Sequence, residues 1–206
     1  MIRFIPLFLL ISSCSQLPIA YMQNFSEVNK VIFGFPDYEI TQEVFDGYDY
    51  SFAKVQFDRG PHSILILAYI EGDVYEWVGN DNVRLYTQNG RVIKTTGLLH
   101  DFEIRNPQKL NSEIINTTSY ESIDLYEPDF FGGTIESTYS AKKENIRRFG
   151  TKAEVLKLKQ VARLKSIAWK AKNSFYLDEV TGTVVQSKQK LHPRLTEINI
   201  EFYYKF

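Results

Sequence analysis

Apolar and polar positions alternate with a period of two along most of the chain after residue 48, and this period is typical of β-strands. The sharpest local signal is Asn89-Gly90, which separates two alternating runs. These two residue types tolerate the positive φ angles of a type I′ hairpin turn. Ser63–Ile70 is an apolar run bounded by turn residues, as expected of a buried strand. The pattern predicts an antiparallel meander with strands near residues 50–57, 63–70, 74–78, 83–88, 91–96, 174–178, 183–187 and 196–205.

Residues 151–171 give conflicting local signals. Thr151 and Glu154 form a capping box, and the apolar positions after them fit the stripe of a helix. Leu156 and Leu158, two positions apart, also suit a strand, so the local pattern leaves helix and strand open. Elsewhere the pattern predicts a partly looped segment at 106–119, a turn at Phe130–Gly133, and short helices at Met22–Val31 and from Thr41.

The first fourteen residues have the layout of a secretory signal. Arg3 precedes the apolar run Phe4–Ile11, which is too short to cross about 30 Å of hydrocarbon as a helix. Ile11-Ser12-Ser13-Cys14 then resembles a bacterial lipobox, in which Cys14 accepts a diacylglycerol group and becomes the new N-terminus. Several acyl chains anchor a protein stably, because each buried CH₂ contributes about 0.8 kcal/mol. The alternative is an ordinary secreted protein whose signal ends near a cysteine.

The residue after Cys14 bears on the destination. Cys14 is followed by Ser15 and not by an aspartate. In bacterial lipoproteins, this resemblance implies transit to the outer membrane. The expected organisation is therefore a signal peptide at residues 1–13, a lipidated tether at 14–21 and a single β-rich domain at 22–206.

Composition narrows the function further. The chain has 206 residues, with 24 Lys and Arg against 25 Asp and Glu, so it lacks the basic excess of sequence-independent nucleic-acid binders. With its single cysteine lipidated, the mature chain has no thiol for a disulfide. The 13 Tyr, 15 Phe and 2 Trp residues favour a β-rich fold, because aromatic side chains fit a pleated, half-buried surface.

Histidines and glycine-rich loops give no sign of a cofactor or metal site. His62, His100 and His192 are far apart and show no close ligand spacing, so surface or loop roles are expected. His100 beside Asp101 resembles a base with its orienting carboxylate, but no G-x-S-x-G nucleophile motif completes it. Gly132-Gly133 lacks the Lys-Ser/Thr of a phosphate-binding loop.

Charged residues also have simpler explanations. The pairs Asp46 with Asp49 and Asp124 with Asp129 are conceivable glycosidase carboxylates, but solvated loop positions are expected for them. A basic cluster that could meet anionic sugar or lipid, Lys142-Lys143 with Arg147-Arg148, is expected to be a solvated face.

Two stretches resemble the YjbF/GfcB-type lipoproteins of capsule and exopolysaccharide operons. The first is Pro61–Leu99, with a buried strand, the Trp77 strand, Asn89-Gly90-Arg91 and Thr95–Leu98. The chain departs from the family pattern at Ser122–Leu125, where an arginine before the aspartate and a tryptophan after it are frequent. The second stretch carries Trp169, Asn173, Phe175-Tyr176, Asp178, Thr181-Gly182, Ser187, Gln189 and Pro193.

The resemblance implies strands across residues 153–171 and an outer-membrane lipoprotein that faces the periplasm and assists polysaccharide assembly or export. It implies no enzymatic activity and no cofactor. The partners would be the membrane, through Cys14, and polysaccharide or export proteins. We therefore predict a mainly β fold of antiparallel meander sheets, forming a sandwich or an open half-barrel, with one or two short helices near the N-terminus.

The sequence leaves three hypotheses for the function of the protein. The first is a non-enzymatic accessory lipoprotein, the second a carrier that shields lipid or glycan in a large apolar cavity, and the third a glycan-modifying enzyme with two facing carboxylates. Trp77, Trp169 and Tyr176 are the candidates for stacking on sugar rings, although burial in the core explains aromatic residues equally simply.

Overall fold

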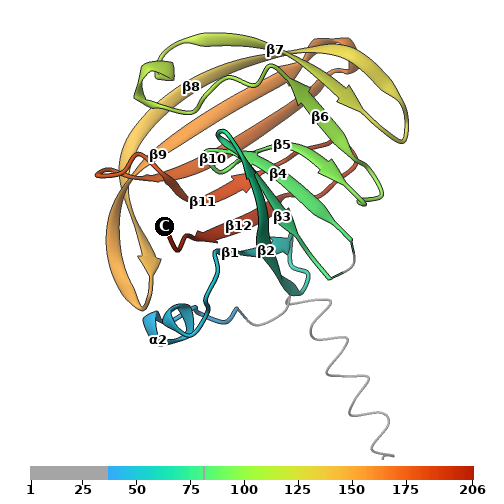
Figure 1. Cartoon of the computed structure of the whole chain (residues 1–206). Coiled ribbons are helices and arrows are strands. Elements are labelled where there is room, and N and C mark those ends of the chain that lie inside the picture. The colour runs from blue at the N-terminus through green and yellow to red at the C-terminus, as the bar shows by residue number, and fades with distance from the viewer. Residues whose placement is uncertain (1–36, 81) are drawn as a thin grey trace, which may run out of the picture.

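The computed structural model describes residues 37–80 and 82–206, and within them twelve antiparallel strands form a closed barrel (Figure 1). Each strand pairs with its neighbours in sequence, and the first strand also pairs with the last. The strands are β1 (Phe52–Phe57), β2 (His62–Glu71), β3 (Val74–Val78), β4 (Arg84–Gln88), β5 (Arg91–Thr96), β6 (Phe102–Arg105), β7 (Thr118–Leu125), β8 (Phe130–Arg148), β9 (Thr151–Leu164), β10 (Trp169–Asp178), β11 (Val184–Gln189) and β12 (Ile198–Tyr203). The helices are α2 (Gln42–Asp46) and the 3₁₀ turns η1 (Ser112–Ile114) and η2 (Lys165–Ile167).

Closure depends on β1, which pairs with β2 along one edge and β12 along the other. Val55 lies opposite Ile200 in β12 and opposite Ser63 in β2. The expectation of mainly antiparallel β structure is confirmed, but the sandwich or open half-barrel is wrong. Closure removes the unpaired strand edges that either of those would leave.

Of the other local expectations, some are confirmed and some are wrong. Residues 151–164 form strand β9, so the capping-box signal is overridden by pairing on both sides. The turn expected at Phe130–Gly133 is wrong, because the chain turns at 126–129 and β8 has already begun at Phe130. Thr41 does cap a helix, accepting a hydrogen bond from Val44 N–H at 3.2 Å. The helix expected at Met22–Val31 lies outside the described residues.

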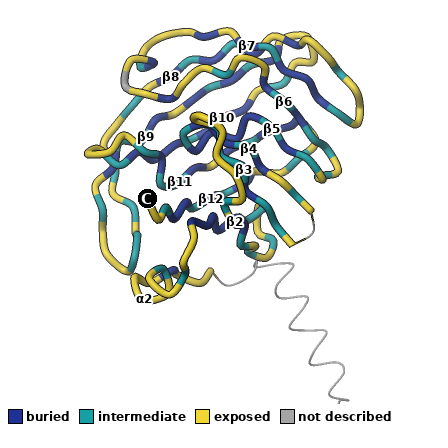
Figure 2. Tube along the Cα trace, in the orientation of Figure 1, coloured by how far each residue is buried: buried dark blue, intermediate teal, exposed yellow. Residues whose placement is uncertain are grey.

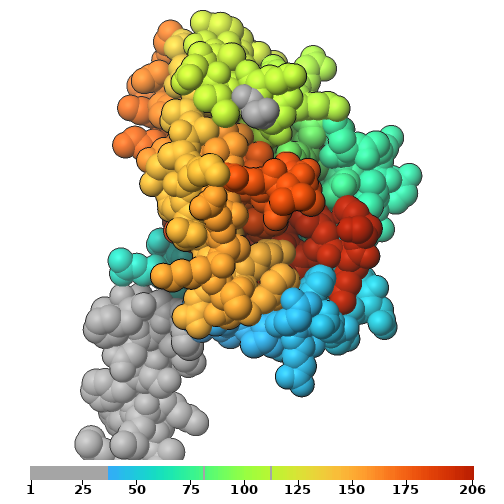
Figure 3. All heavy atoms as spheres, turned by 90° about the vertical axis from the view of Figure 1, so that its left-hand side faces the viewer, coloured from blue at the N-terminus to red at the C-terminus, as the bar shows by residue number. Residues whose placement is uncertain are grey.

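The β8–β9 hairpin is the longest in the barrel and reaches α2 (Figures 1 and 3). At its tip, the Phe149 ring lies 5.3 Å from that of Phe45 in α2. Beneath α2, Phe52 of β1 and Tyr203 of β12 stack with centroids 4.8 Å apart. A small second core, separate from the barrel interior, therefore holds α2 against the outer surface of β1 and β12.

Buried positions recur along the strands of the barrel (Figure 2), and the buried apolar side chains form one core inside it. Trp77 is fully buried, and its Nε1 donates to Thr87 Oγ1 at 2.8 Å. A cavity inside the barrel, lined by Ile135, Trp169 and Leu191 among others, measures about 20 Å³. That volume accommodates about one water and is far too small for an acyl chain. This cavity is therefore not the large apolar chamber that a carrier requires.

Several buried polar groups inside the barrel are paired with one another. Arg91 and Glu121 form a two-pronged ion pair with N–O distances of 2.7 and 2.6 Å, and their side chains are 4% and 1% exposed. Gln160 donates to Ser137 and accepts from Asn173. Such pairing is what allows a charge and amides to lie in an apolar interior.

The Asn89-Gly90 turn has a tertiary role beyond its hairpin. Both residues adopt positive φ angles, 42° and 68°, as the sequence predicts. A Cβ on Gly90 would lie 2.4 Å from Val184, so only glycine fits there. The Asn89 side chain accepts from Val184 N–H and donates to Leu110 C=O, tying this turn to two distant segments.

Candidate functional site

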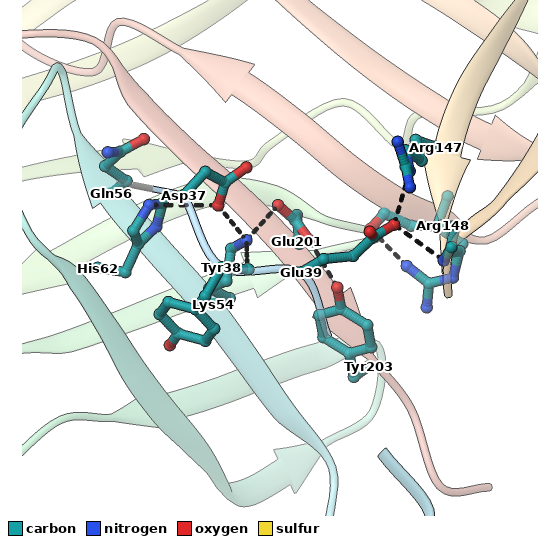
Figure 4. Close-up of polar contacts among 12 residues, drawn as sticks. Asp37, Tyr38, Glu39, Lys54, Gln56, His62, Arg147, Arg148, Glu201 and Tyr203 are labelled. Atoms are coloured by element: carbon teal, nitrogen blue, oxygen red, sulfur yellow. Dashed lines mark hydrogen bonds and ion pairs between the residues drawn. The ribbon is translucent and has the colours of Figure 1, made fainter. Parts of the chain in front are cut away.

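A polar groove of about 150 Å³ lies on the outside of the barrel, across β2, β1, β12 and β11. Its floor includes outward-facing residues in direct cross-strand register: His62 opposite Gln56, Gln56 opposite Asn199, and Asn199 opposite Lys188. The segment that begins at Asp37 passes over one side (Figure 4). We call this the outer groove; it is lined by Asp37, Lys54, Gln56, His62, Gln186, Lys188, Asn199 and Glu201.

Lys54 is the electrostatic centre of the outer groove. Its side chain is only 3% exposed, and Nζ lies 2.7 Å from Asp37 Oδ1, 3.0 Å from Glu201 Oε1 and 2.8 Å from the Tyr38 carbonyl oxygen. Burial opposes the charge, but the hydrogen bonds to Asp37 and Glu201 prevail, so the pKa of Lys54 lies above its usual value. Both carboxylates are thereby occupied by one ammonium group.

His62 and Asn199 have unused hydrogen-bonding capacity. The His62 side chain is 6% exposed, and neither ring nitrogen makes a hydrogen bond with the described residues. Burial, followed by the positive charge of Lys54, lowers the pKa of His62, although Asp37 lies 3.3 Å from Nε2 and opposes this. The buried Asn199 Oδ1 is also unpaired among the described residues. Unpaired buried polar atoms are rare in native proteins, so these atoms are suited to meeting a ligand.

The chemistry of the outer groove is that of recognition. A neutral imidazole, three amides and the Lys188 ammonium can donate to and accept from hydroxyl groups. Asp37 and Glu201 share Lys54, which is unlike the free acid and base pair of glycoside hydrolysis. Within residues 37–80 and 82–206 no group of three or more His, Cys, Asp and Glu is placed to hold a metal ion.

The three aromatic residues predicted to stack on sugars do not come together at the outer groove. Trp77 has no exposed surface, and Tyr176 is 6% exposed with Lys157 Nζ 4.8 Å from its ring centre. Trp169 is partly buried against the main core, and its Nε1 has no partner among the described residues. The lipidation candidate, Cys14, lies outside the described residues.

The other sequence candidates have structural partners. His100 and His192 stack with ring centres 5.1 Å apart, while Asp101 accepts from Thr95 and from the N–H groups of Gly97 and Leu98, not from His100. Asp124 is held by Arg105 and by Gly132 N–H.

The basic cluster of residues 142–148 is largely neutralised. Lys142 pairs with Glu144, Lys143 with Glu154 and Glu179, and Arg147 with Glu39. Arg148 donates to the carbonyl oxygen of Phe202 at 2.7 Å. This cluster therefore serves the packing of the β8–β9 hairpin.

Sequence reasoning missed the outer groove because its residues come from four separate strands and a preceding segment. The available signal was the outward phase of each strand: Lys54 and Gln56 alternate with Ala53 and Val55. Only the register between β1 and β12, strands far apart in the chain, brings Asn199 beside Gln56.

The chain belongs to the family described as "Group 4 capsule polysaccharide lipoprotein gfcB, YjbF", which it matches over residues 25–203. It is 25% identical over 181 residues to the uncharacterized lipoprotein GfcB of Escherichia coli K12, covering 83% of this chain and 84% of that protein. A second relative from the same organism, the uncharacterized lipoprotein YjbF, is 33% identical over 64 residues, 31% of this chain and 30% of that protein. The expected family resemblance is confirmed.

The fold also has a solved counterpart. The crystal structure of the hypothetical lipoprotein YmcC from Escherichia coli K12 superimposes with a TM-score of 0.72 at 22% sequence identity, covering 93% of this chain and 98% of that one. At this identity the likeness concerns the fold alone. The relatives are uncharacterised lipoproteins, and the family description names no enzymatic activity. Within the described residues, no helix is long and apolar enough to cross a membrane.

Proposed function

We propose that the protein is an acylated envelope lipoprotein that assists the assembly or export of a capsular or extracellular polysaccharide without catalysing a reaction. Membership of a capsule polysaccharide lipoprotein family is the observation that carries this proposal. The lipobox-like Ile11–Cys14 supports anchoring through Cys14, and Ser15 supports an outer-membrane destination facing the periplasm.

The filled barrel favours contact over enclosure. A carrier that shields a lipid needs an apolar chamber, whereas the cavity inside the barrel beside Ile135, Trp169 and Leu191 measures only about 20 Å³. His62 and Asn199, whose buried polar atoms make no hydrogen bond with the described residues, line the outer groove instead. The barrel therefore acts as a rigid support that presents its outer surface to the polymer or to export proteins.

The test of anchoring is made in a strain that lacks the chromosomal gene and carries plasmid copies. Cys14→Ala removes the acylated thiol, and Ser12→Ala is the matched control that keeps a small residue in the same motif. We expect the wild type and Ser12→Ala in the outer-membrane fraction, and Cys14→Ala absent from it with an unchanged Tm of the barrel. Recovery of Cys14→Ala with the outer membrane would overturn the tether.

The test of function measures polysaccharide at the cell surface in the same strains. Cys14→Ala is expected to lower it several-fold, because an untethered barrel loses its high local concentration at the membrane. Ser15→Asp keeps acylation but is expected to hold the protein in the inner membrane, with a similar loss. Full polymer levels with both variants would contradict a role in export at the outer membrane.

A further inference from the structure

A second surface continues from the outer groove onto β11, β10 and β9. The outward-facing row begun by His62, Gln56, Asn199 and Lys188 extends in register through Ser174 opposite Lys188, Lys159 opposite Ser174, and Ser140 opposite Lys159. Seven adjacent strands thus contribute one polar residue each. At about 4.8 Å between strands, the row follows the barrel surface for about 29 Å. We call it the polar row; it consists of His62, Gln56, Asn199, Lys188, Ser174, Lys159 and Ser140.

Positive charge gathers beside the polar row. Lys170 and Lys172 of β10 face outward on the same surface, and Lys170 lies opposite Arg163 of β9. Lys172 lies two positions from Ser174, which places it diagonally from both Lys159 and Lys188, about 7–8 Å away. We call these residues the basic face: Lys159, Arg163, Lys170, Lys172 and Lys188.

The four lysines of the basic face are exposed, and no Asp or Glu among the described residues forms an ion pair with them. This contrasts with Lys142, Lys143 and Lys157, each of which has a glutamate within 4.0 Å. The whole chain has a net charge of only −1, so the positive charge here is a local concentration. Neighbouring like charges on a sheet cost stability, and such a surface attracts polyanions.

The composition of the surface distinguishes a polymer from a membrane. Along the polar row, lysines alternate with hydroxyl and amide side chains. The lysines can bind carboxylates, and the hydroxyl and amide side chains can bind sugar hydroxyl groups. A membrane-binding face needs apolar side chains to insert. Among the described residues, the large exposed hydrophobic side chains lie elsewhere, and none is on β9, β10 or β11.

The outer groove supplies an independent indication of a ligand. His62 and Asn199, towards one end of the polar row, carry buried polar atoms that make no hydrogen bond with the described residues. Lys188 belongs to the outer groove, the polar row and the basic face together. One extended chain lying along the row would meet both the cations and the unpaired atoms.

We infer that the outer groove and basic face form one binding surface for an acidic polysaccharide, a linear sugar polymer bearing carboxylates. The inference rests on the proposed function and names its ligand class. The lysines bind carboxylates along the polymer, and the amides and His62 bind hydroxyl groups of a terminal or kinked segment within the outer groove.

The test measures binding of the mature, acylated chain in detergent micelles to short polygalacturonate, with neutral dextran of the same length as the reference polymer. We expect saturable binding to polygalacturonate that weakens as salt rises, and at least ~10-fold weaker binding to dextran. The triple variant Lys159→Gln/Lys172→Gln/Lys188→Gln should lose ~10-fold or more in affinity, with a shallower salt dependence. Asn199→Ala should weaken binding several-fold without changing the salt dependence.

The control is Lys94→Gln/Lys109→Gln/Lys152→Gln, which removes the same charge from other parts of the surface. Equal losses in both triple variants would overturn the inference, because binding would then follow net charge alone. Equal binding of both polymers, or no binding of polygalacturonate, would also overturn it. Tighter, lysine-dependent binding to phosphatidylglycerol vesicles than to polygalacturonate would make the surface a membrane contact instead. None of these results bears on surface polysaccharide levels in cells, which test the proposed function separately.

Discussion

The inside and outside of this barrel use the same polar residue types in opposite ways. Inside, Gln189 accepts from Val92 N–H and donates to the Gly90 carbonyl oxygen, so its amide is fully engaged. Outside, the Asn199 Oδ1 is buried but unpaired among the described residues. The interior amide of Gln189 therefore holds strands together, whereas the carbonyl oxygen of Asn199 in the outer groove is available for recognition.

Charged side chains inside and outside the barrel differ in the same respect, because those inside are paired and, among the described residues, the lysines of the basic face are not. Arg91 and Glu121 are buried and satisfy each other, with Gln108 N–H also donating to Glu121. The lysines at 159, 170, 172 and 188 are exposed and have no acidic partner among the described residues. Substitutions inside should therefore change stability, and those outside should change binding.

The largest effect is expected from Arg91→Met. This variant leaves the Glu121 carboxylate buried without its partner, which costs about 3–5 kcal/mol of unfolding free energy. Urea denaturation followed by tryptophan fluorescence measures it. The double variant Arg91→Met/Glu121→Leu should recover much of the loss, and a double variant as unstable as the single one would contradict this account of the pair.

A smaller effect is expected from Gln189→Ala. The variant leaves Val92 N–H and the Gly90 carbonyl oxygen buried without their partner, at a cost of about 1–3 kcal/mol. Chemical denaturation gives the value. A change below about 0.5 kcal/mol would mean that the interior network does not hold β5 to β11.

The next loss of stability is expected on lowering the pH. His192 is 1% exposed, and burial, followed by the charges of His100 and Arg194, lowers its pKa to about 4. The unfolded chain takes up a proton near pH 6.5 while the folded chain does so only near pH 4, so stability falls as pH decreases through this window. The loss reaches about 2 kcal/mol at about pH 5, because one pKa unit corresponds to about 1.4 kcal/mol. Thermal unfolding between pH 7 and pH 4 measures it, and His192→Asn should flatten the profile.

The smallest effect on stability is expected outside, from Asn199→Ala. Its carbonyl oxygen has no described partner to lose, so the free energy of unfolding should change by no more than about 0.5 kcal/mol. Side-by-side denaturation with Gln189→Ala makes the comparison direct. An equal cost for both variants would remove the distinction between the interior and the outer groove.

Much of the fold follows from local sequence signals. Asn89-Gly90 predicts its hairpin because few residue types adopt two successive positive φ angles. The apolar run of residues 63–70 predicts strand β2, but the expectation that this strand is buried is wrong, because Ile66, Tyr69 and Ile70 are exposed. For Thr151–Leu164 the local signals conflict, and pairing with β8 and β10 decides for strand.

The chain by itself determined the period of its strands, the Asn-Gly hairpin, the lipobox-like tetrad and the family, since each depends on residues close together or on a pattern of types. Tertiary structure alone decided the closure of the barrel and the assembly of the outer groove. Closure joins Phe52 to Tyr203 across 150 intervening residues, and the alternation within each strand says nothing about its distant partner. Register then turns scattered outward-facing residues into one surface.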